Sequence, residues 1–350
     1  MTDDRRNSEP PGLDLQSLQR FLADAAPGLL DGSLRAELIV GGKSNLTYVV
    51  SDGSREVVVR RPPLGHVLAT AHDMTREHRV MAALADTAVP VPRMYAACTD
   101  TDVIGAPFYV MERVAGTPYR TAEELNPLGP ERVRAIANSV TDTLVALHDV
   151  DPAEVGLGDF GKPEGYLERQ VHRWRRQMQA SHSRELAGEE ELHQALAAAI
   201  PESSGATIVH GDYRMDNTLI GEADRVTAVL DWEMATLGDP LADVALMLVY
   251  QALADDAPHA VSTVSRANGH PSRDEIVHRY SERSGRDVSH LAFHEALAYY
   301  KLAAILEGIW FRYQQGQTVG AGFDDIGGST EPLLAAGLAV IRNYHAAPKG

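Results

Sequence analysis

The chain has 350 residues, 44% hydrophobic and 23% charged, which is an ordinary composition for one or two folded domains. Its formal net charge of −17 argues against nucleic acid as a partner, because nucleic-acid binding depends on clustered basic side chains. The single cysteine, Cys98, excludes an internal disulfide framework and favours a reducing cytoplasm. No apolar run approaches the ~18 residues of a membrane span, so we expect no membrane partner.

The first third of the chain predicts a small lobe that mixes strands and helices. Residues 1–11 are polar and are expected to be disordered, as are the last few residues of the chain. Apolar residues at helical spacing predict an amphipathic helix over 13–22 and a second helix over 75–84. Short β-rich runs bounded by turns predict strands at 38–40, 47–50, 56–60 and 108–111.

From about residue 121 the composition becomes helical. Long segments with helical periodicity predict helices over 131–148, 164–180 and 189–199. A short hairpin follows, with strands at 218–220 and 226–230, and helices dominate the rest of the chain. The fold class is therefore predicted to be α+β, with a small β-rich lobe followed by a larger and mostly helical one.

The sequence "HGDYRMDN", followed by "LDWE", is the most informative feature of the chain. It places Asp212, Asn217 and Asp231 at the spacing of metal-assisted phosphoryl transfer. Asp212 is the candidate that orients the acceptor hydroxyl and receives its proton. Asn217 and Asp231 are the predicted Mg²⁺ ligands, because hard oxygen ligands suit this ion. Arg214 either steadies the charge of the transferred phosphoryl group or forms an ion pair with a nearby acidic residue.

A glycine-containing loop joins two of the predicted strands near the N-terminus. Glycines let a backbone approach phosphates, and unpaired N–H groups can cradle them. A plain hairpin turn would look similar. The Walker-type phosphate loop is excluded, because Glu37 stands where that motif requires glycine and because a strand follows. The candidate phosphate-binding residues are Gly41, Gly42, Ser44 and Asn45.

The catalytic motifs "HGDYRMDN" and "LDWEMATLGDPLADVA" resemble those of the aminoglycoside phosphotransferase family of small-molecule kinases, a branch of the protein-kinase-like fold. "GGKSNLTYVV", "VVVRRPPLG" and "YYKLAAILEGIWFRYQQGQ" are similar to the kinase-like domains fused to acyl-CoA dehydrogenases. The resemblance implies a bilobal fold that uses ATP and Mg²⁺. Its nucleotide-binding lobe would span residues 1–114, and its helical lobe, with the catalytic loop and the acceptor site, residues 115–350.

The kinase template pairs a strand lysine with a helix glutamate, and this chain departs from it. The strand ends in two arginines and offers no lysine. We assign Arg60 to the lysine position because it continues the strand before the prolines, and Glu77 as its partner. A register shifted by one residue would instead turn Arg61 inward. The resemblance also implies a hinge in which the backbone groups of Glu112 and Val114 reach the adenine.

Three further residues are interpreted as scaffold. His210 is expected to support the loop backbone, Asp239 to cap a helix, and Asp243 to tie that helix to the catalytic loop. Asp216, beside Asn217, is expected at the surface.

The acceptor site should be built from the C-terminal helices. In the segment 299–313, apolar residues at helical spacing predict a core face. The polar and aromatic residues between them could face either a ligand or the core. The predicted core residues are Leu302, Ile305, Leu306 and Ile309. The residues that could face either a ligand or the core are Glu307, Trp310 and Arg312.

The predicted activity is transfer of the γ-phosphate of ATP to a hydroxyl of a small molecule. Two acceptor classes remain open. The subfamily resemblance favours a hydroxyacyl-CoA type of metabolite, which needs an apolar channel with basic residues at its mouth. The acidic balance favours a cationic aminoglycoside, which needs converging carboxylates. An alternative of another class is a non-catalytic nucleotide-binding protein, supported only by Arg60 in place of lysine.

Overall fold

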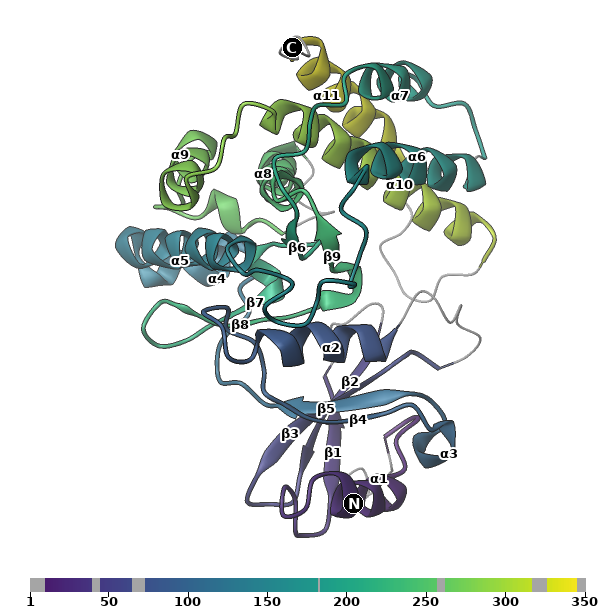
Figure 1. Cartoon of the computed structure of the whole chain (residues 1–350), viewed down its shortest axis with the longest axis vertical. Helices are drawn as coiled ribbons and strands as arrows, with labels where there is room; N and C mark the ends of the chain where they lie inside the picture. The colour runs from purple at the N-terminus through teal and green to yellow at the C-terminus, as the bar shows by residue number, and fades with distance from the viewer. Residues whose placement is uncertain are drawn as a thin grey trace, which may run out of the picture. The chain divides into compact units, whose positions relative to one another are not determined.

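The computed structural model describes residues 10–39, 45–64, 73–181, 183–256, 262–316 and 326–344. These residues belong to two compact units (Figure 1). The first unit comprises Met1–Gly116 with Thr227–Met234, and the second comprises Thr117–Val226 with Ala235–Gly350. The chain therefore divides at Gly116, and the segment that carries Asp231 clusters with the first unit.

The first unit is built on an antiparallel sheet with the strand order β1-β2-β3-β5-β4. β1 precedes its predicted range, because this edge strand has mostly exposed side chains without apolar alternation. β4 was not predicted, since its sequence "MYAAC" lacks β-branched residues. The strands are β1 (Arg35–Leu38), β2 (Leu46–Ser51), β3 (Glu56–Arg61), β4 (Met94–Cys98) and β5 (Phe108–Glu112).

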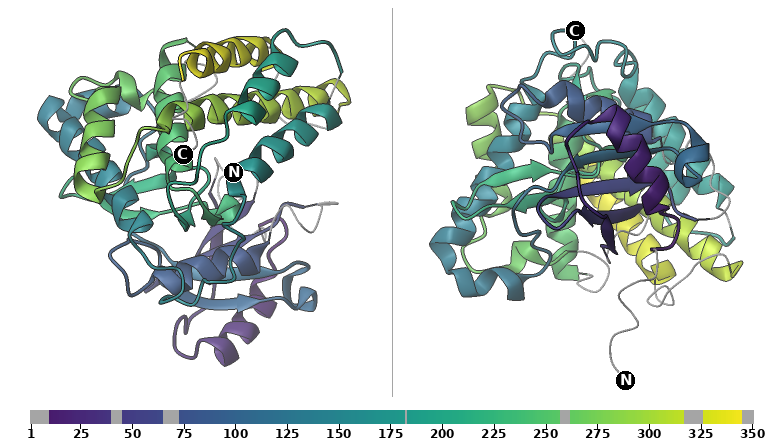
Figure 2. Two further views of the ribbon diagram at one scale, coloured as in Figure 1. Left: turned by 45° about the horizontal axis from the view of Figure 1, so that its top comes forward. Right: turned by 90° about the horizontal axis from the view of Figure 1, so that it is seen from below.

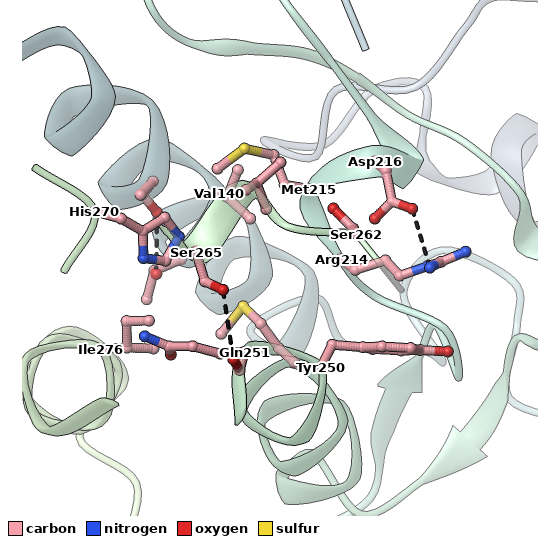
Figure 3. A pocket seen from close by; sticks show the side chains of 14 residues that line it. Val140, Arg214, Met215, Asp216, Tyr250, Gln251, Ser262, Ser265, His270 and Ile276 are labelled. Atoms are coloured by element: carbon pink, nitrogen blue, oxygen red, sulfur yellow. Dashed lines mark hydrogen bonds and ion pairs between the residues drawn. The ribbon is translucent and has the colours of Figure 1, made fainter. Parts of the chain in front are cut away.

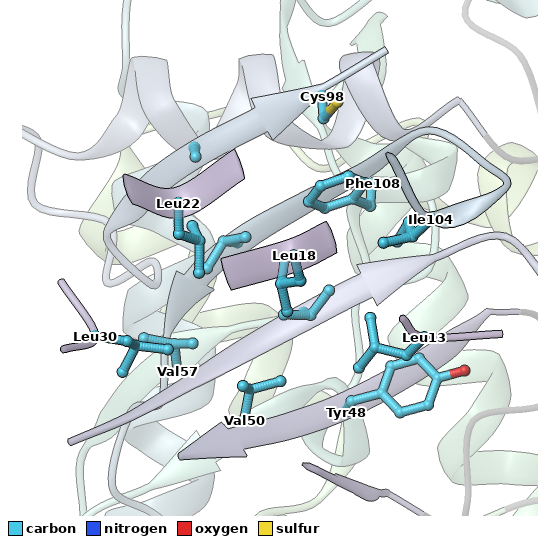
Figure 4. Close-up of a cluster of buried hydrophobic side chains, with 13 residues drawn as sticks. Leu13, Leu18, Leu22, Leu30, Tyr48, Val50, Val57, Cys98, Ile104 and Phe108 are labelled. Carbon is cyan, nitrogen blue, oxygen red and sulfur yellow. The ribbon is translucent and has the colours of Figure 1, made fainter. Parts of the chain in front are cut away.

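Helices cover both faces of this sheet. α1 (Leu15–Ala25) packs Leu18 and Leu22 onto one face, against apolar residues of β2, β3 and β5 (Figure 4). Figure 2 shows α1 crossing that face in its right-hand view. α2 (Met74–Leu84) contacts β4 and β5 from the other face, and the short α3 (Thr101–Ile104) precedes β5. Because successive strand residues point to opposite faces, neighbouring side chains of β3 meet different helices.

The expected disorder of residues 1–11 falls on residues 1–9, which lie outside the described residues, and on Pro10 and Pro11. The hydroxyl of Tyr48 donates a hydrogen bond to the carbonyl of Pro11, which ties this described segment to β2. Pro10 and Pro11 are thus part of the described structure of the first unit.

The second unit is mostly helical, as the α+β prediction requires. Its longest helix, α10, packs against α6, α8 and α11. Two of its short strands, β6 and β9, pair with each other. No helix in the described ranges is long and apolar enough to cross a membrane. The helices are α4 (Ala122–Leu125), α5 (Pro130–His148), α6 (Tyr166–Ala180), α7 (Glu189–Ala198), α8 (Leu241–Asp256), α9 (Arg273–Ser284), α10 (Leu291–Gln314) and α11 (Thr330–Arg342). The strands are β6 (Thr207–Val209), β7 (Thr218–Ile220) and β9 (Thr236–Gly238), whereas β8 (Val226–Val229) belongs to the first unit except for Val226.

The predicted core face of α10 is only partly correct. Leu302 is buried, whereas Ile305, Leu306 and Ile309 are half-buried. The buried side chain at that turn is Glu307, whose carboxylate accepts hydrogen bonds from Arg184 at 2.7 Å and from Thr330 at 3.1 Å. This ion pair turns Glu307 inward and leaves the three apolar residues at the flanks. Glu307 therefore has a structural role: of the two positions predicted for it, facing a ligand or in the core, it takes the core position. Trp310 is half-buried beside Arg184, and Arg312 is exposed on the last turn.

Candidate functional site

The loop that is predicted to be catalytic begins in the second unit, where β6 ends at Val209, and a carboxylate of α8 fixes its backbone. Asp243 accepts hydrogen bonds from the backbone N–H groups of His210 at 2.7 Å and of Gly211 at 2.8 Å. Gly211 has a φ of +83°, a conformation that favours glycine. The Nδ1 atom of His210 accepts from the N–H of Asp212 at 3.2 Å. His210 and Asp243 thus support the loop as predicted.

Asp243 and Asp239 also behave as scaffold. Burial opposes the ionisation of Asp243, but the hydrogen bond and charge of His148 and the backbone donor of Gly211 outweigh it and lower its pKa. Asp239 Oδ1 accepts from the N–H of Leu241 at 3.0 Å and so caps α8. The predicted roles of both aspartates are confirmed.

Asp212 is oriented by two donors. Its Oδ2 atom accepts from the side-chain amide of Asn217 at 3.0 Å, and its Oδ1 atom lies 3.3 Å from the hydroxyl of Tyr250. The Asp212 side chain remains 23% exposed. The carboxylate is therefore held in one position while part of it stays accessible to an approaching hydroxyl.

The side-chain amide of Asn217 is oriented by two hydrogen bonds to Asp212. Its amide nitrogen donates to the backbone carbonyl of Asp212 at 2.9 Å and to Asp212 Oδ2. The amide oxygen must then point away from Asp212, and oxygen is the atom that Mg²⁺ takes from an asparagine. The donor chemistry of Asn217 thus fits its predicted role.

Arg214 and Asp216 form an ion pair next to Asp212. Arg214 lies 3.0 Å from Asp216 and 3.5 Å from Asp212, and its guanidinium is 4.9 Å from the centre of the Tyr250 ring. Of the two readings of Arg214, the ion pair is present. The surface position expected for Asp216 is wrong, since its side chain is only 12% exposed. The 3-10 turn Met215–Asn217 directs it inward, and burial raises its pKa against the charge of Arg214.

In the first unit, Arg60 joins two carboxylates. Its Nε atom lies 3.3 Å from Glu77 Oε2, and its Nη2 atom lies 2.5 Å from Asp231 Oδ1. Glu77 is only 1% exposed and also accepts from the Tyr109 hydroxyl at 2.9 Å. Burial raises the pKa of Glu77, and the charge of Arg60 and the hydrogen bond of Tyr109 oppose that rise. Glu77 is therefore a buried partner of Arg60.

The register of β3 separates the two arginines. Arg61 points to the opposite face from Arg60 and donates to the carbonyls of Gly12 at 2.5 Å and Ile104 at 2.9 Å. It braces the segment before α1, whereas Arg60 meets Glu77.

Asp231 has an unusual backbone. Its φ of +68° is in the left-handed region, which costs free energy for a residue other than glycine. The fully buried Trp232 follows it, and the indole N–H donates to the carbonyl of Val229 at 3.0 Å. The Asp231 side chain is 29% exposed. The turn thus presents a carboxylate, a hard oxygen ligand of the kind Mg²⁺ prefers.

The remaining nucleotide-site predictions lie at the ends of strands. Gly41, Gly42 and Ser44 lie outside the described residues. Asn45 is buried, and its amide nitrogen lies 3.3 Å from Glu77 and 3.4 Å from Glu233. Glu112 ends β5 and donates its N–H to the carbonyl of Arg93 at 2.8 Å, and Val114 follows the strand half-buried.

Two residues of the second unit were missed by the sequence analysis. Tyr250 of α8 contacts Asp212, as described above. Lys301 of α10 donates to the carbonyl of Gly211 at 2.5 Å and lies 5.6 Å from the Trp174 ring. Burial lowers the pKa of Lys301, and the charge of Asp212 opposes that effect. The one available signal was a lysine that interrupts the apolar run of α10.

Substitution of Lys301 tests whether this contact positions the catalytic loop. Lys301→Met keeps the chain length but removes the hydrogen bond to Gly211, so we expect kcat to fall about tenfold with the KM for ATP nearly unchanged. Steady-state kinetics would measure both constants. Lys162→Met, at an exposed lysine, is the control. An unchanged kcat in Lys301→Met would show that the loop does not need this contact.

A double-mutant cycle tests the Arg60–Glu77 pair. Arg60→Met and Glu77→Gln should each lower turnover and stability, because each removes one charge of a buried ion pair. The double variant should lose less than the sum of the single variants. Arg60→Lys should retain much of the activity, since lysine is the usual residue of the template. Additive losses would contradict the pairing. The control cycle uses the exposed pair of Arg113 and Glu56, where we expect little coupling.

Comparisons with known proteins agree with this architecture. A family model described as the phosphotransferase enzyme family matches residues 35–280. The mouse acyl-CoA dehydrogenase family member 10 is 36% identical over 301 residues, which cover 83% of this chain and 28% of that protein. The chain thus spans less than half the length of the curated relatives it matches.

Solved structures show the same fold. A Ralstonia eutropha JMP134 protein, provisionally assigned as an aminoglycoside phosphotransferase, is 33% identical and matches with a TM-score of 0.83, covering 95% of this chain and 99% of that one. The aminoglycoside phosphotransferase APH(4)-Ia, solved with AMP-PNP and hygromycin B, is 15% identical, with a TM-score of 0.61 and coverage of 95% and 99%. The second match shows the protein-kinase-like fold alone. With the family model covering most of its length, the chain belongs to the phosphotransferase enzyme family.

Proposed function

We propose that the chain is an ATP-dependent phosphotransferase that moves the γ-phosphate to a hydroxyl of a small molecule. The observation that carries this proposal is the oriented, partly exposed carboxylate of Asp212, held by Asn217 and Tyr250. The acceptor oxygen forms a bond to the γ-phosphorus while its proton passes to Asp212. The bond from the γ-phosphorus to the bridging oxygen breaks, and ADP leaves.

Each remaining candidate residue has a proposed role. Mg²⁺, when bound, neutralises phosphate charge, and the amide oxygen of Asn217 and the carboxylate of Asp231 are its proposed ligands. Arg60, fixed by Glu77, is proposed to contact an ATP phosphate. Arg214 is proposed to stabilise charge on the transferred group. The proposed nucleotide contacts are the loop residues Gly41, Gly42, Ser44 and Asn45, for the phosphates, and the backbone of Glu112 and Val114, for the adenine.

For the acceptor we propose a hydroxyacyl-CoA type of metabolite. Support comes from the curated relatives, several of which are named as acyl-CoA dehydrogenase family members. The net charge of −17 favours the second candidate, a cationic aminoglycoside. A non-catalytic nucleotide-binding protein is disfavoured, because Asp212 accepts hydrogen bonds from both Asn217 and Tyr250. These hydrogen bonds orient its carboxylate, and a reacting carboxylate has to be oriented.

A screen of ATP consumption tests the function. The protein would be incubated with ATP and Mg²⁺ and with hydroxyacyl-CoAs, aminoglycosides or sugars, with Asp212→Asn as the blank. We expect ADP release that depends on one acceptor class and vanishes in the blank. ADP release that is equal in both proteins for every acceptor would overturn the proposal.

A further inference from the structure

A cavity of the second unit lies beside the catalytic loop (Figure 3). It is open to solvent, and the empty space among its lining residues, solvent included, is about 500 Å³. The loop contributes Arg214 and Asp216 to its wall, and α5, α8 and α9 contribute mainly apolar side chains such as Val140, Met247 and Ile276.

The hydroxyl donors of the wall are already used within the protein. Thr141 donates to the carbonyl of Ala137 at 3.2 Å, and Tyr250 to Asp212 at 3.3 Å. The hydroxyls of Ser262 and Ser265 donate to backbone carbonyls at 2.8 and 3.4 Å. A ligand therefore finds few hydroxyl donors here.

Two hydrogen-bond acceptors of the wall, in contrast, have no donor within the described residues. The buried atoms Asp216 Oδ1 and Gln251 Oε1 accept no hydrogen bond from any other described residue. The orientation of Gln251 is fixed, because its amide nitrogen donates to the carbonyl of Pro271 at 3.1 Å. A buried acceptor without a partner costs free energy, so both oxygens favour a ligand that supplies O–H or N–H groups.

His270 contributes another acceptor. Its Nδ1 atom lies 3.0 Å from the carbonyl of Pro271, which can only accept, so Nδ1 carries the proton. Burial lowers the pKa of His270, against the effect of this hydrogen bond, and keeps the ring neutral near pH 7. Its Nε2 atom is then an acceptor.

The charge of the cavity disfavours anions. The guanidinium of Arg214 faces two carboxylates, Asp216 at 3.0 Å and Asp212 at 3.5 Å. The guanidinium is thus already paired with carboxylates within the protein, so it offers little attraction to an added carboxylate or phosphate. Tyr250 and Arg214 belong to the cavity wall and also contact Asp212, which connects the cavity to the proposed catalytic carboxylate.

We propose that this cavity binds the non-reacting part of the phosphoryl acceptor, and that this part is an uncharged or cationic group with O–H or N–H donors on an apolar frame. The assignment rests on the proposed function of the chain. For a coenzyme A thioester, it places the phosphate-bearing end outside the cavity and leaves only a donor-bearing, apolar part of the molecule to enter it.

Three matched probes test the proposal. Aminobutanol, butanediol and hydroxybutyrate, each linear and terminally substituted, share a four-carbon chain with a hydroxyl and differ in the group at the other end. Their dissociation constants would be measured by ligand-observed NMR titration of the whole chain without nucleotide. We expect aminobutanol and butanediol to bind at least about tenfold more tightly than hydroxybutyrate. Equal or tighter binding of hydroxybutyrate would overturn the proposal.

A variant of the wall locates the binding. Gln251→Leu removes an acceptor oxygen and should weaken aminobutanol and butanediol binding about tenfold. Gln194→Leu, at an exposed glutamine of α7, should leave both unchanged. Undiminished binding to a folded Gln251→Leu protein would overturn the assignment. If that variant does not fold, Asp216→Asn replaces it. We then expect a smaller preference for aminobutanol over butanediol. An unchanged preference would contradict the proposal.

The test separates this proposal from the function on which it rests. If the preferred probes do not bind while the ATP screen succeeds, the cavity assignment fails alone. If they bind as expected but no acceptor stimulates ATP consumption, the phosphotransferase proposal fails and the cavity remains a ligand site.

Discussion

Replacing Asp212 by asparagine is expected to reduce turnover by roughly 10²–10⁴ and to leave ATP binding nearly intact, which is the usual contribution of a general base. The variant keeps the size of the side chain and one oxygen that can accept from Tyr250. The bond from Asn217 to the backbone carbonyl of residue 212 also remains possible. What is lost is the negative charge that orients and deprotonates the acceptor hydroxyl.

The measurement pairs single-turnover kinetics with calorimetric titration of ATP. A matched control is Asp142→Asn on α5, where the carboxylate forms a partly exposed ion pair with Arg279 at 2.7 Å. We expect wild-type turnover in the control. If Asp212→Asn turned over at the wild-type rate, Asp212 would have no part in the mechanism.

The contact between Asp212 and Asn217 is local, and local contacts are the kind that spacing along the sequence can indicate. Asp212 and Asn217 are five residues apart, and their hydrogen bond follows from one turn of chain. The choice between Arg60 and Arg61 was harder. β3 is apolar and buried at three successive positions, Val57 to Val59, so its pattern did not reveal which face meets α2.

Contacts between distant segments could not be predicted from spacing. Lys301 reaches Gly211 across 90 residues, and Tyr250 reaches Asp212 across 38. The periodicity of α8 and α10 indicates which side chains are buried, but it does not indicate which loop Tyr250 or Lys301 contacts. The short strands β6 and β9 escaped prediction for a similar reason, because three residues carry too little alternation to identify a strand.

Removing the charge of Asp231 should have the second large effect. Asp231→Asn leaves Arg60 paired with Glu77 but takes a carboxylate from the proposed metal site. A metal clamp on transferring phosphates contributes several kcal/mol, so we expect turnover to fall by roughly 10³-fold. ATP affinity should also lose its dependence on Mg²⁺. Asparagine tolerates the left-handed backbone of this position, so the turn itself should persist.

Calorimetric titration of ATP with and without Mg²⁺ measures this effect, and Asp224→Asn is its matched control. Asp224 also has a positive φ, of 57°, but lies in the hairpin turn and pairs with Arg132 at 2.7 Å. The control should bind ATP with the Mg²⁺ dependence of the wild type, because it keeps every proposed ligand. If Asp231→Asn bound ATP as tightly as the wild type at saturating Mg²⁺, Asp231 would not be a metal ligand. Its strained backbone would then serve only the ion pair with Arg60.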